Sequence, residues 1–202
     1  MPGRPAFYLF AGPNGSGKST LQRLLSRLFP PMANIEFVNA DEIAKGLGDD
    51  DSVERAERAR IAADARRAEL LKAGTSFCSE TVFSHASKIE LLQEAKGAGF
   101  EIYLFVVCVA NPDLSELRVN QRILRGGHNV PGNKIRERFP KALKNLEAAI
   151  SIADHCLVFD NSAIAALPRL LLVLEHGRLV HETTDMPQWA EPLRAVARKT
   201  GK

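Results

Sequence analysis

Short apolar runs alternate with stretches of helical periodicity along the chain, and these runs are the candidate strands. In chain order they are "FYLFA" (7–11), "IEFVNA" (35–40), "SFCSE" (76–80), "EIYLFVVCVA" (101–110) and "CLVFD" (156–160). The fourth run is apolar at almost every position, which is typical of a central parallel strand covered on both faces. After the fifth run, "LLLVLEHGRLVHE" (170–182) predicts two strands around a His-Gly turn.

Helical segments separate these runs. A charged helix is expected over about 53–73, and a helix from about 86 opens with a predicted capping box of Ser87 and Glu90. The triplet Asn111-Pro112-Asp113 is a helix-start signal. A periodic helix over about 134–151 carries a predicted buried stripe of Ile135, Phe139, Leu143, Leu146 and Ile150.

This order of elements predicts an α/β fold. We expect a central, mainly parallel five-stranded sheet with helices on both faces, a helical lid and a C-terminal β-hairpin. The 202 residues suit a single domain over 1–202, in which the lid occupies about 113–150.

Composition narrows the class of protein only slightly. The net charge of +3, from 27 basic and 24 acidic residues, is too weak to indicate nucleic-acid binding on its own. The three cysteines Cys78, Cys108 and Cys156 lack metal-site spacing and are expected to be buried, reduced thiols. Neither a signal peptide nor an apolar run long enough to cross a bilayer is visible, so we expect a cytoplasmic protein without a membrane partner.

The sharpest motif is "AGPNGSGKST" at positions 11–20, a complete Walker A pattern between a predicted strand and a predicted helix. Its backbone amides and the following helix N-terminus are suited to ATP phosphates, Lys18 to the β- and γ-phosphates and Ser19 to Mg²⁺. The fold class is then a P-loop NTPase-type three-layer sandwich. The predicted nucleotide-binding residues are Gly12, Pro13, Asn14, Gly15, Ser16, Gly17, Lys18, Ser19 and Thr20.

Motifs of other P-loop classes are missing from the sequence. It contains neither an Asn-Lys-x-Asp guanine motif nor a Leu-Ser-Gly-Gly-Gln stretch, and no apolar strand ends in an Asp-Glu pair. These absences disfavour a switch or a motor.

Two carboxylates follow predicted strands at the sheet edge where ligands of open α/β sheets bind. Asp41 follows the second strand, where it is either a general base or the N-cap of a short helix. Glu80 ends the third strand, where it orients an acceptor, helps to hold the metal through water, or is a surface carboxylate. The segment 160–162 either borders the nucleotide base or forms a simple turn.

Arginines cluster around a helix that "GGHNVPGN" (126–133) interrupts. Such a lid could neutralise charge on a transferring phosphoryl group; the alternative is a solvated basic face. His128 is interpreted as a hinge residue. The arginines are Arg118, Arg122 and Arg125 before the break and Arg136 and Arg138 after it, and the last two flank the buried stripe equally.

These segments together resemble the zeta-toxin family of P-loop kinases, especially its small free-standing bacterial members. The resemblance covers about residues 6–162 and rests on "AGPNGSGKST", "VNADEIAKGL", "SETVFSH" and "RVNQRILRGGHNVPGNKIRERF". Asn-Ala-Asp after the second strand and Gly-Gly-His-x-Val-Pro between arginines are its most specific parts.

The resemblance implies a kinase core with a helical lid, an alcohol group as acceptor, and a toxin whose partner is an antitoxin protein. The family's best-known acceptor is UDP-N-acetylglucosamine. Carried over by motif, Asp41 is the base, Lys18 binds phosphate and Ser19 binds magnesium. Glu80 and Arg118 are assigned to the substrate, while Arg122 and one of Arg136 or Arg138 contact the transferring phosphates.

Three functions remain open from the sequence. The first is an ATP- and Mg²⁺-dependent kinase that phosphorylates a small acceptor, expected to be a nucleotide sugar. The second is a nucleic-acid end kinase, although nucleic acid is not the expected partner. The third is a nucleotide-dependent switch or binding protein that has no acceptor.

Overall fold

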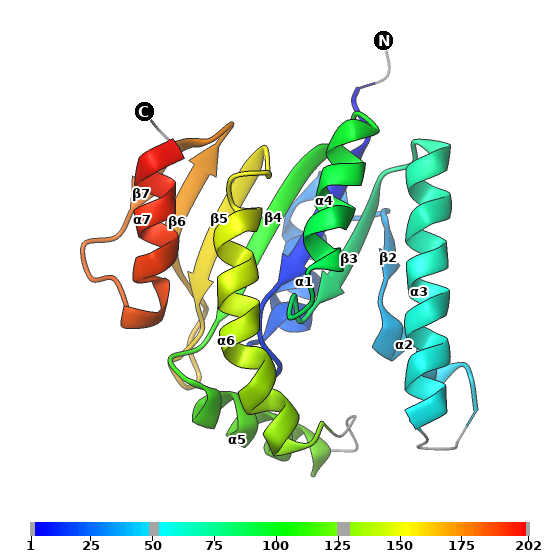
Figure 1. Ribbon diagram of the computed structural model, residues 1–202, viewed down its shortest axis with the longest axis horizontal. Helices are drawn as coiled ribbons and strands as arrows, with labels where there is room; N and C mark the ends of the chain where they lie inside the picture. The colour runs from blue at the N-terminus through cyan, green and yellow to red at the C-terminus, as the bar shows by residue number, and fades with distance from the viewer. Residues whose placement is uncertain (1–2, 49–52, 125–129, 201–202) are drawn as a thin grey trace.

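The computed structural model describes residues 3–48, 53–124 and 130–200, and its centre is one seven-stranded sheet (Figure 1). The strand order is β2-β3-β1-β4-β5-β6-β7, in which the first five strands are parallel. Strands β6 and β7 form an antiparallel hairpin that continues the sheet beyond β5. Their bounds are β1 Ala6–Ala11, β2 Glu36–Val38, β3 Phe77–Thr81, β4 Glu101–Cys108, β5 His155–Asp160, β6 Arg169–Glu175 and β7 Arg178–Glu182.

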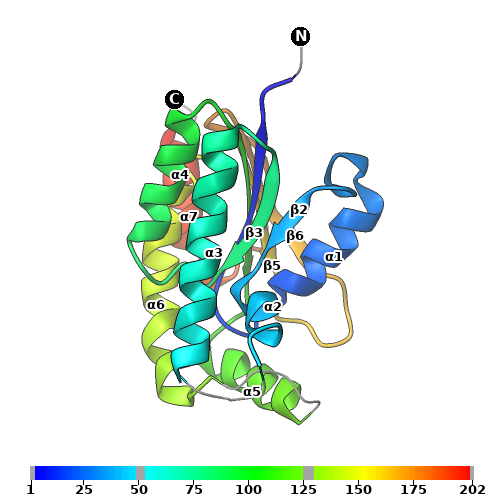
Figure 2. The same cartoon turned by 90° about the vertical axis from the view of Figure 1, so that its right-hand side faces the viewer.

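The helices cover the two faces of the sheet unequally. Helices α3, α4, α6 and α7 pack on one face, α1 lies on the other, and α5 lies below the carboxyl ends of the strands (Figure 2). The α-helices are α1 Lys18–Leu28, α2 Ala40–Lys45, α3 Val53–Ala73, α4 Ser87–Gly97, α5 Pro112–Ile123, α6 Gly132–Ala149 and α7 Glu191–Thr200. Two short 3₁₀ helices, Pro30–Met32 and Gln188–Ala190, complete the described elements.

The core follows this division. The larger hydrophobic cluster joins β1, β3, β4 and β5 to the four-helix face, and its fully buried members include Phe7, Phe77 and Leu146. The smaller cluster lies under α1 and contains Phe10 and Phe105, whose rings stack with centroids 4.6 Å apart. Strand β4 contributes to both clusters because it is covered on both faces, as its continuous apolar run predicts.

Both outer strands of the sheet carry ion pairs. Strand β2 is only three residues long, and Arg66 donates to both carboxylate oxygens of its Glu36, at 2.7 and 2.8 Å. On the opposite edge, Arg198 of α7 pairs with Glu182 of β7. A charged helix side chain therefore lies beside each edge of the sheet.

The predicted fold class is confirmed: the α/β arrangement, the mainly parallel sheet and the C-terminal hairpin are all present. The predicted capping box on α4 is wrong. Ala86 is the N-cap residue, and Ser87 lies in the first turn, where its amide donates to His85 Nδ1 at 3.2 Å. Among the described residues, no helix combines the length and the apolar character needed to cross a membrane.

Candidate active site

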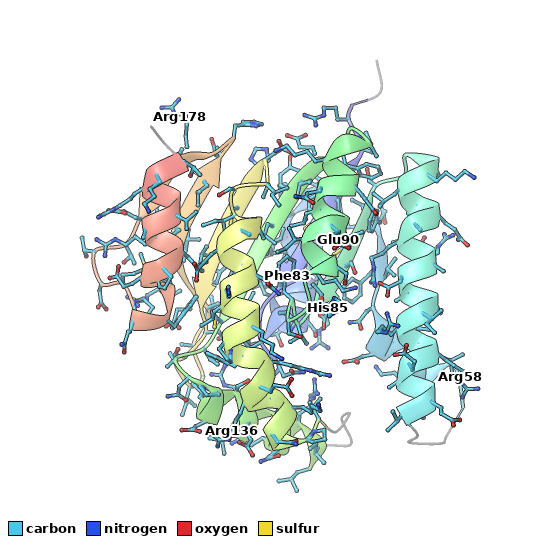
Figure 3. All side chains as sticks on the ribbon, in the orientation of Figure 1. Arg58, Phe83, His85, Glu90, Arg136 and Arg178 are labelled. Atoms are coloured by element: carbon cyan, nitrogen blue, oxygen red, sulfur yellow. The ribbon has the colours of Figure 1, made fainter. Side chains whose placement is uncertain are left out.

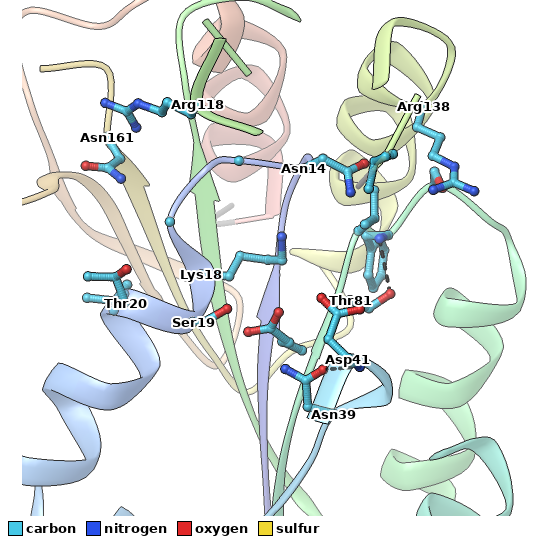
Figure 4. Close-up of a pocket in the computed structure, with 18 of the residues that line it drawn as sticks. Asn14, Lys18, Ser19, Thr20, Asn39, Asp41, Thr81, Arg118, Arg138 and Asn161 are labelled. Atoms are coloured by element: carbon cyan, nitrogen blue, oxygen red, sulfur yellow. Dashed lines mark hydrogen bonds between the residues drawn. The ribbon is translucent and has the colours of Figure 1, made fainter. Parts of the chain in front are cut away.

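The carboxyl ends of the parallel strands open onto a cleft of about 1310 Å³. The Walker A loop forms its floor. Its walls come from α2 and the end of β3, from α3 and α4, from α5 and α6, and from the segment after β5. Figure 4 shows Lys18 and Ser19 at the start of α1, facing Asp41 and Thr81 across the cleft. The sheet edge anticipated from the strand order is therefore where the polar side chains gather.

The loop reaches its shape through glycines at positive φ. Gly15 and Gly17 have φ of 67° and 98°, which side chains disfavour. A Cβ atom built on Gly17 would lie 2.3 Å from Asn161 Nδ2, which itself donates to the carbonyl of Ser16 at 2.8 Å. Since α1 begins at Lys18 without a side-chain cap, its first amides point into the loop and favour a bound anion.

Lys18 is almost fully buried at the centre of this site. Its ammonium donates to the carbonyl of Pro13 at 3.0 Å. Burial lowers its pKa, while the nearby carboxylates of Glu80 and Asp41 oppose the shift, Glu80 more strongly. The positive charge of Arg122 also lowers the pKa of Lys18. A buried lysine facing two carboxylates and a guanidinium is an arrangement suited to a highly charged ligand.

Buried polar atoms without a protein partner mark the same place. Three of the six such atoms among the described residues lie at the loop and the strand end: Asn14 Oδ1 and Ser16 Oγ in the loop and Glu80 Oε2 at the end of β3. Buried polar groups are nearly always hydrogen-bonded, and leaving one unpaired costs roughly 1–3 kcal/mol. Unsatisfied atoms at the loop and at the strand end are therefore expected to find their partners in a ligand, an ion or water.

The role of Asp41 as an N-cap is excluded by the structure. Asn39 is the N-cap residue of α2, and its Oδ1 accepts the amide of Asp41 at 2.8 Å. Asp41 therefore lies inside the first turn with its carboxylate exposed to the cleft (Figure 4). The alternative that remains from the sequence is the general base.

The two arginines of α6 differ in their surroundings. Arg138 lines the cleft, whereas Arg136 is outside its lining. Arg136, labelled near the bottom of Figure 3, pairs with Asp113 Oδ1 at 2.5 Å and Glu116 Oε2 at 2.8 Å on α5. This contact joins α6 to α5, so the structure assigns Arg136 to the helix contact and leaves Arg138 facing the ligand space.

Both candidate arginines of α5 that the structure describes reach the cleft. Arg122 lines it, and Arg118 does so while donating to the carbonyl of Ala163 at 3.1 Å. Burial lowers the pKa of the Arg118 guanidinium, and Asp160 opposes that shift. Two further predicted residues, Arg125 and His128, lie outside the described residues.

Two strand-end segments have structural roles. The side chain of Asn111 caps α5 by accepting the amide of Leu114 at 2.9 Å. Asp160 accepts hydrogen bonds from Ser162 Oγ and, at 3.1 Å, Trp189 Nε1. The following Asn161 borders the cleft and holds the Walker A loop. Asp160 therefore has the role expected of a simple turn, whereas Asn161 is placed where a residue could border a bound nucleotide.

A cationic group on the far wall of the cleft was missed from the sequence. Arg67 of α3 is 6% exposed and donates to Ser79 Oγ at 3.1 Å, while Lys88 of α4 lies 3.0 Å from Asp64 Oδ1. Asp64 also pairs with Arg67. Arg67 stands in the run "RARIAADARRAE", which reads as a solvated helix face, so the only available signal was its excess of arginine.

Comparison with solved structures supports the same fold. A complex of AvrRxo1-ORF1 and -ORF2 with ATP matches with a TM-score of 0.70 and 17% identity, over 98% of this chain and 77% of that chain. The PezAT toxin–antitoxin system of Streptococcus pneumoniae matches with a TM-score of 0.61 and 17% identity, over 98% and 86% of the two chains. A Pnkp1/Rnl/Hen1 RNA repair complex matches with a TM-score of 0.56 and 20% identity, over 73% and 47%.

Sequence comparison identifies the family. A search of curated proteins gave no significant match. The profile of the zeta toxin family, however, matches residues 1–168, which include the Walker A loop, Asp41, Glu80 and helices α5 and α6. The chain belongs to the zeta toxin family of P-loop kinases.

Proposed function

We propose that this protein transfers the γ-phosphoryl group of ATP to a hydroxyl of a small acceptor, with Mg²⁺ as cofactor. The observation that carries the proposal is the convergence of Lys18, Glu80 and Asp41 in one cleft, where both carboxylates act on the buried ammonium. A donor and an acceptor need such opposed groups, because one side must hold phosphates and the other must accept a proton.

The donor side is the Walker A loop. The N-terminus of α1, which has no side-chain cap, and Lys18 suit the β- and γ-phosphates, and a structural relative is described with ATP bound. Two oxygens of this chain fit Mg²⁺, which prefers oxygen ligands: the Ser19 hydroxyl and the unpartnered Glu80 Oε2. When bound, Mg²⁺ would neutralise charge on the phosphates.

In the transfer step, the hydroxyl oxygen of the acceptor forms a bond to the γ-phosphorus, and Asp41 accepts the proton of that hydroxyl. The bond between that phosphorus and the bridging oxygen breaks, and ADP leaves. Arg138 and Arg122 line the cleft and stabilise the negative charge of the transferring group. Helices α5 and α6 act as the lid that brings these guanidiniums to the phosphates.

A nucleotide sugar such as UDP-N-acetylglucosamine is the acceptor that fits best. The cleft of about 1310 Å³ exceeds the roughly 300–1,000 Å³ typical of a site for one small ligand. Its far wall adds Arg67 and Lys88, which are not needed for ATP and suit an acceptor that carries phosphate. Glu80 and Arg118 would contact this acceptor.

The family also motivates a biological setting. One structural relative is described as a toxin–antitoxin system, so we propose a cytoplasmic toxin that an antitoxin protein restrains. Co-purification with the product of a neighbouring gene, followed by loss of ADP formation in the complex, would test this pairing.

The test of the kinase is ADP release by the purified chain with and without UDP-sugars. Asp41→Asn keeps the shape of the side chain but removes its basicity, and we expect acceptor-dependent turnover to fall about 10²–10⁴-fold with ATP binding retained. The matched control is Glu42→Gln, since Glu42 is the neighbouring carboxylate, lies outside the cleft lining and pairs with Lys45 at 2.7 Å. Turnover that survives Asp41→Asn would exclude Asp41 as the base.

The same assay separates the two other functions. Oligonucleotides with free hydroxyl ends, supplied in place of the sugar, test for a nucleic-acid end kinase. A switch protein would form ADP at one rate whether or not any acceptor is present.

A further inference from the structure

A second group of polar side chains lies at the opposite end of the sheet from the cleft. Glu101 opens β4, His155 opens β5, and His176 stands in the turn between β6 and β7. One potential metal-ligand atom from each lies within 4.8 Å of the others. Arg178, which follows this turn, marks that end of the molecule in Figure 3, and Arg136 marks the opposite end.

Strand pairing fixes two of the three side chains. His155 of β5 pairs with Tyr103 of β4, and Glu101 is two residues before Tyr103. The side chains of Glu101, Tyr103 and His155 therefore lie on one face of the sheet. The imidazole of His155 stacks on the Tyr103 ring with centroids 4.5 Å apart and planes at 10°. This stack holds His155 Nε2 at 2.9 Å from Glu101 Oε1.

The third side chain is set by the hairpin turn. His176 and Gly177 have φ of 47° and 78°, the pattern of a two-residue type I′ turn, in which Asn-Gly is the favoured pair. This chain has histidine where asparagine would suit the backbone better. The turn brings the His176 ring to a centroid distance of 5.0 Å from the His155 ring.

A carboxylate also stands behind His176. Asp154 Oδ1 is 3.9 Å from His176 Nδ1, and its Oδ2 accepts the amide of Ile102 at 3.0 Å. Lys96 Nζ lies 3.6 Å from the same Oδ1. A carboxylate that accepts a hydrogen bond from one ring nitrogen commonly orients a histidine whose other nitrogen binds a metal, and at 3.9 Å Asp154 can do so only after the His176 ring moves closer.

We propose that Glu101, His155 and His176 form a binding site for a transition-metal dication such as Zn²⁺ or Ni²⁺. Two imidazoles and a carboxylate are the donors that these ions prefer, whereas Mg²⁺ prefers oxygen ligands. Bonds of about 2.0–2.2 Å place tetrahedral donors about 3.4 Å apart, so the Glu101–His155 pair needs little adjustment. The His176 side chain is 63% exposed, which leaves it free to move inward by the remaining ångström or so.

The arrangement without a metal is a hydrogen bond between His155 and Glu101 with a ring stack, and it would give these residues a purely structural role. That alternative accounts for His155 and Glu101 but not for the choice of histidine in the turn. A bound ion would tie the starts of β4 and β5 to the hairpin. It would stabilise the fold, because a ligand that binds only the native state raises the unfolding temperature. The site is independent of the proposed kinase chemistry.

The experiment is a calorimetric titration of ZnCl₂ and NiCl₂ into the untagged chain after EDTA has stripped it of metal and been removed. Excess Mg²⁺ is present to compete for the oxygen ligands of the cleft. We expect one ion per chain and a rise in the unfolding temperature.

Two variants test the ligands. His176→Asn keeps a residue that tolerates positive φ, and Glu101→Gln keeps the side-chain shape; each should weaken binding at least about tenfold and abolish the temperature rise. His181→Gln, which changes an exposed histidine of β7 outside the group, should bind as the parent does. The proposal is overturned if the parent binds no ion at 100-fold excess, or if both ligand variants bind as tightly as the parent.

Discussion

The two arginines of α6 offer the most direct test of how the cleft works. Arg138 and Arg136 lie two positions apart and carry the same charge, but only Arg138 lines the cleft. Replacing each with glutamine removes one positive charge from the same helix. Any difference between the two variants therefore reports on position and not on net charge.

The expected losses of kcat in the two variants differ by more than an order of magnitude. Removing one group that stabilises transition-state charge typically costs about 10²–10³-fold in kcat, equivalent to about 2.7–4 kcal/mol. We expect Arg138→Gln to lie in that range with its unfolding temperature unchanged. Arg136→Gln loses two ion pairs whose arginine is 54% exposed, and exposed pairs contribute little to stability because solvent screens them. Its kcat should stay within about twofold, with only a small fall in unfolding temperature.

The assay is steady-state ADP release with saturating ATP and acceptor, paired with thermal unfolding of each variant. Equal losses of kcat in the two variants would show that the general charge of α6 matters and not the placement of Arg138. A kcat for Arg138→Gln within threefold of the parent would remove Arg138 from the chemistry altogether.

Three further predictions follow from local geometry. Gly17→Ala should lower the free energy of unfolding by about 1–3 kcal/mol and raise the KM for ATP, because Gly17 has φ of 98° and faces Asn161. Unfolding in urea measures the first effect. The control is Gly97→Ala, because nothing lies within 4 Å of the Cβ atom that it adds. Burial alone would raise the pKa of Asp64, but hydrogen bonds from Arg67 and Lys88 hold it below its ordinary value. The stability that this carboxylate adds should therefore be present above about pH 4 and decline at lower pH. The unfolding free energies of the parent and of Asp64→Asn should accordingly approach each other as the pH falls below that point. Burial raises the pKa values of the three cysteine thiols, so a thiol reagent at pH 8 should modify them only after unfolding, and rapid labelling of the native chain would contradict the structure.

The fold was largely predictable from the sequence because its signals are local. The continuous run of β4 and the Walker A loop between strand and helix each specify one arrangement. The charged helix expected over about 53–73 is α3, Val53–Ala73. The capping box on α4 failed because His85 offers the amide of Ser87 a competing acceptor that spacing alone does not reveal.

The site was predictable only in part, because its remaining features depend on contacts between distant segments. Asn39 and Asp41 are both good capping residues, and the backbone of α2 decides between them. Arg136 and Arg138 flank the buried stripe equally, and the acids of α5 decide which one faces away from the cleft. The burial of Arg67 depends on Ser79, a residue of another element whose hydroxyl lies beneath α3.

The ion pairs at the two margins of the sheet bear on how the chain behaves at high concentration. An open β-edge is a template on which a second molecule can add a strand, and short edges with charged side chains discourage such growth. Here β2 offers three residues beside Arg66, and β7 is flanked by Arg198 of α7. Neutralising Glu36 and Glu182 together would release both arginines from these margins, and the doubly substituted chain should aggregate at a lower concentration than its parent.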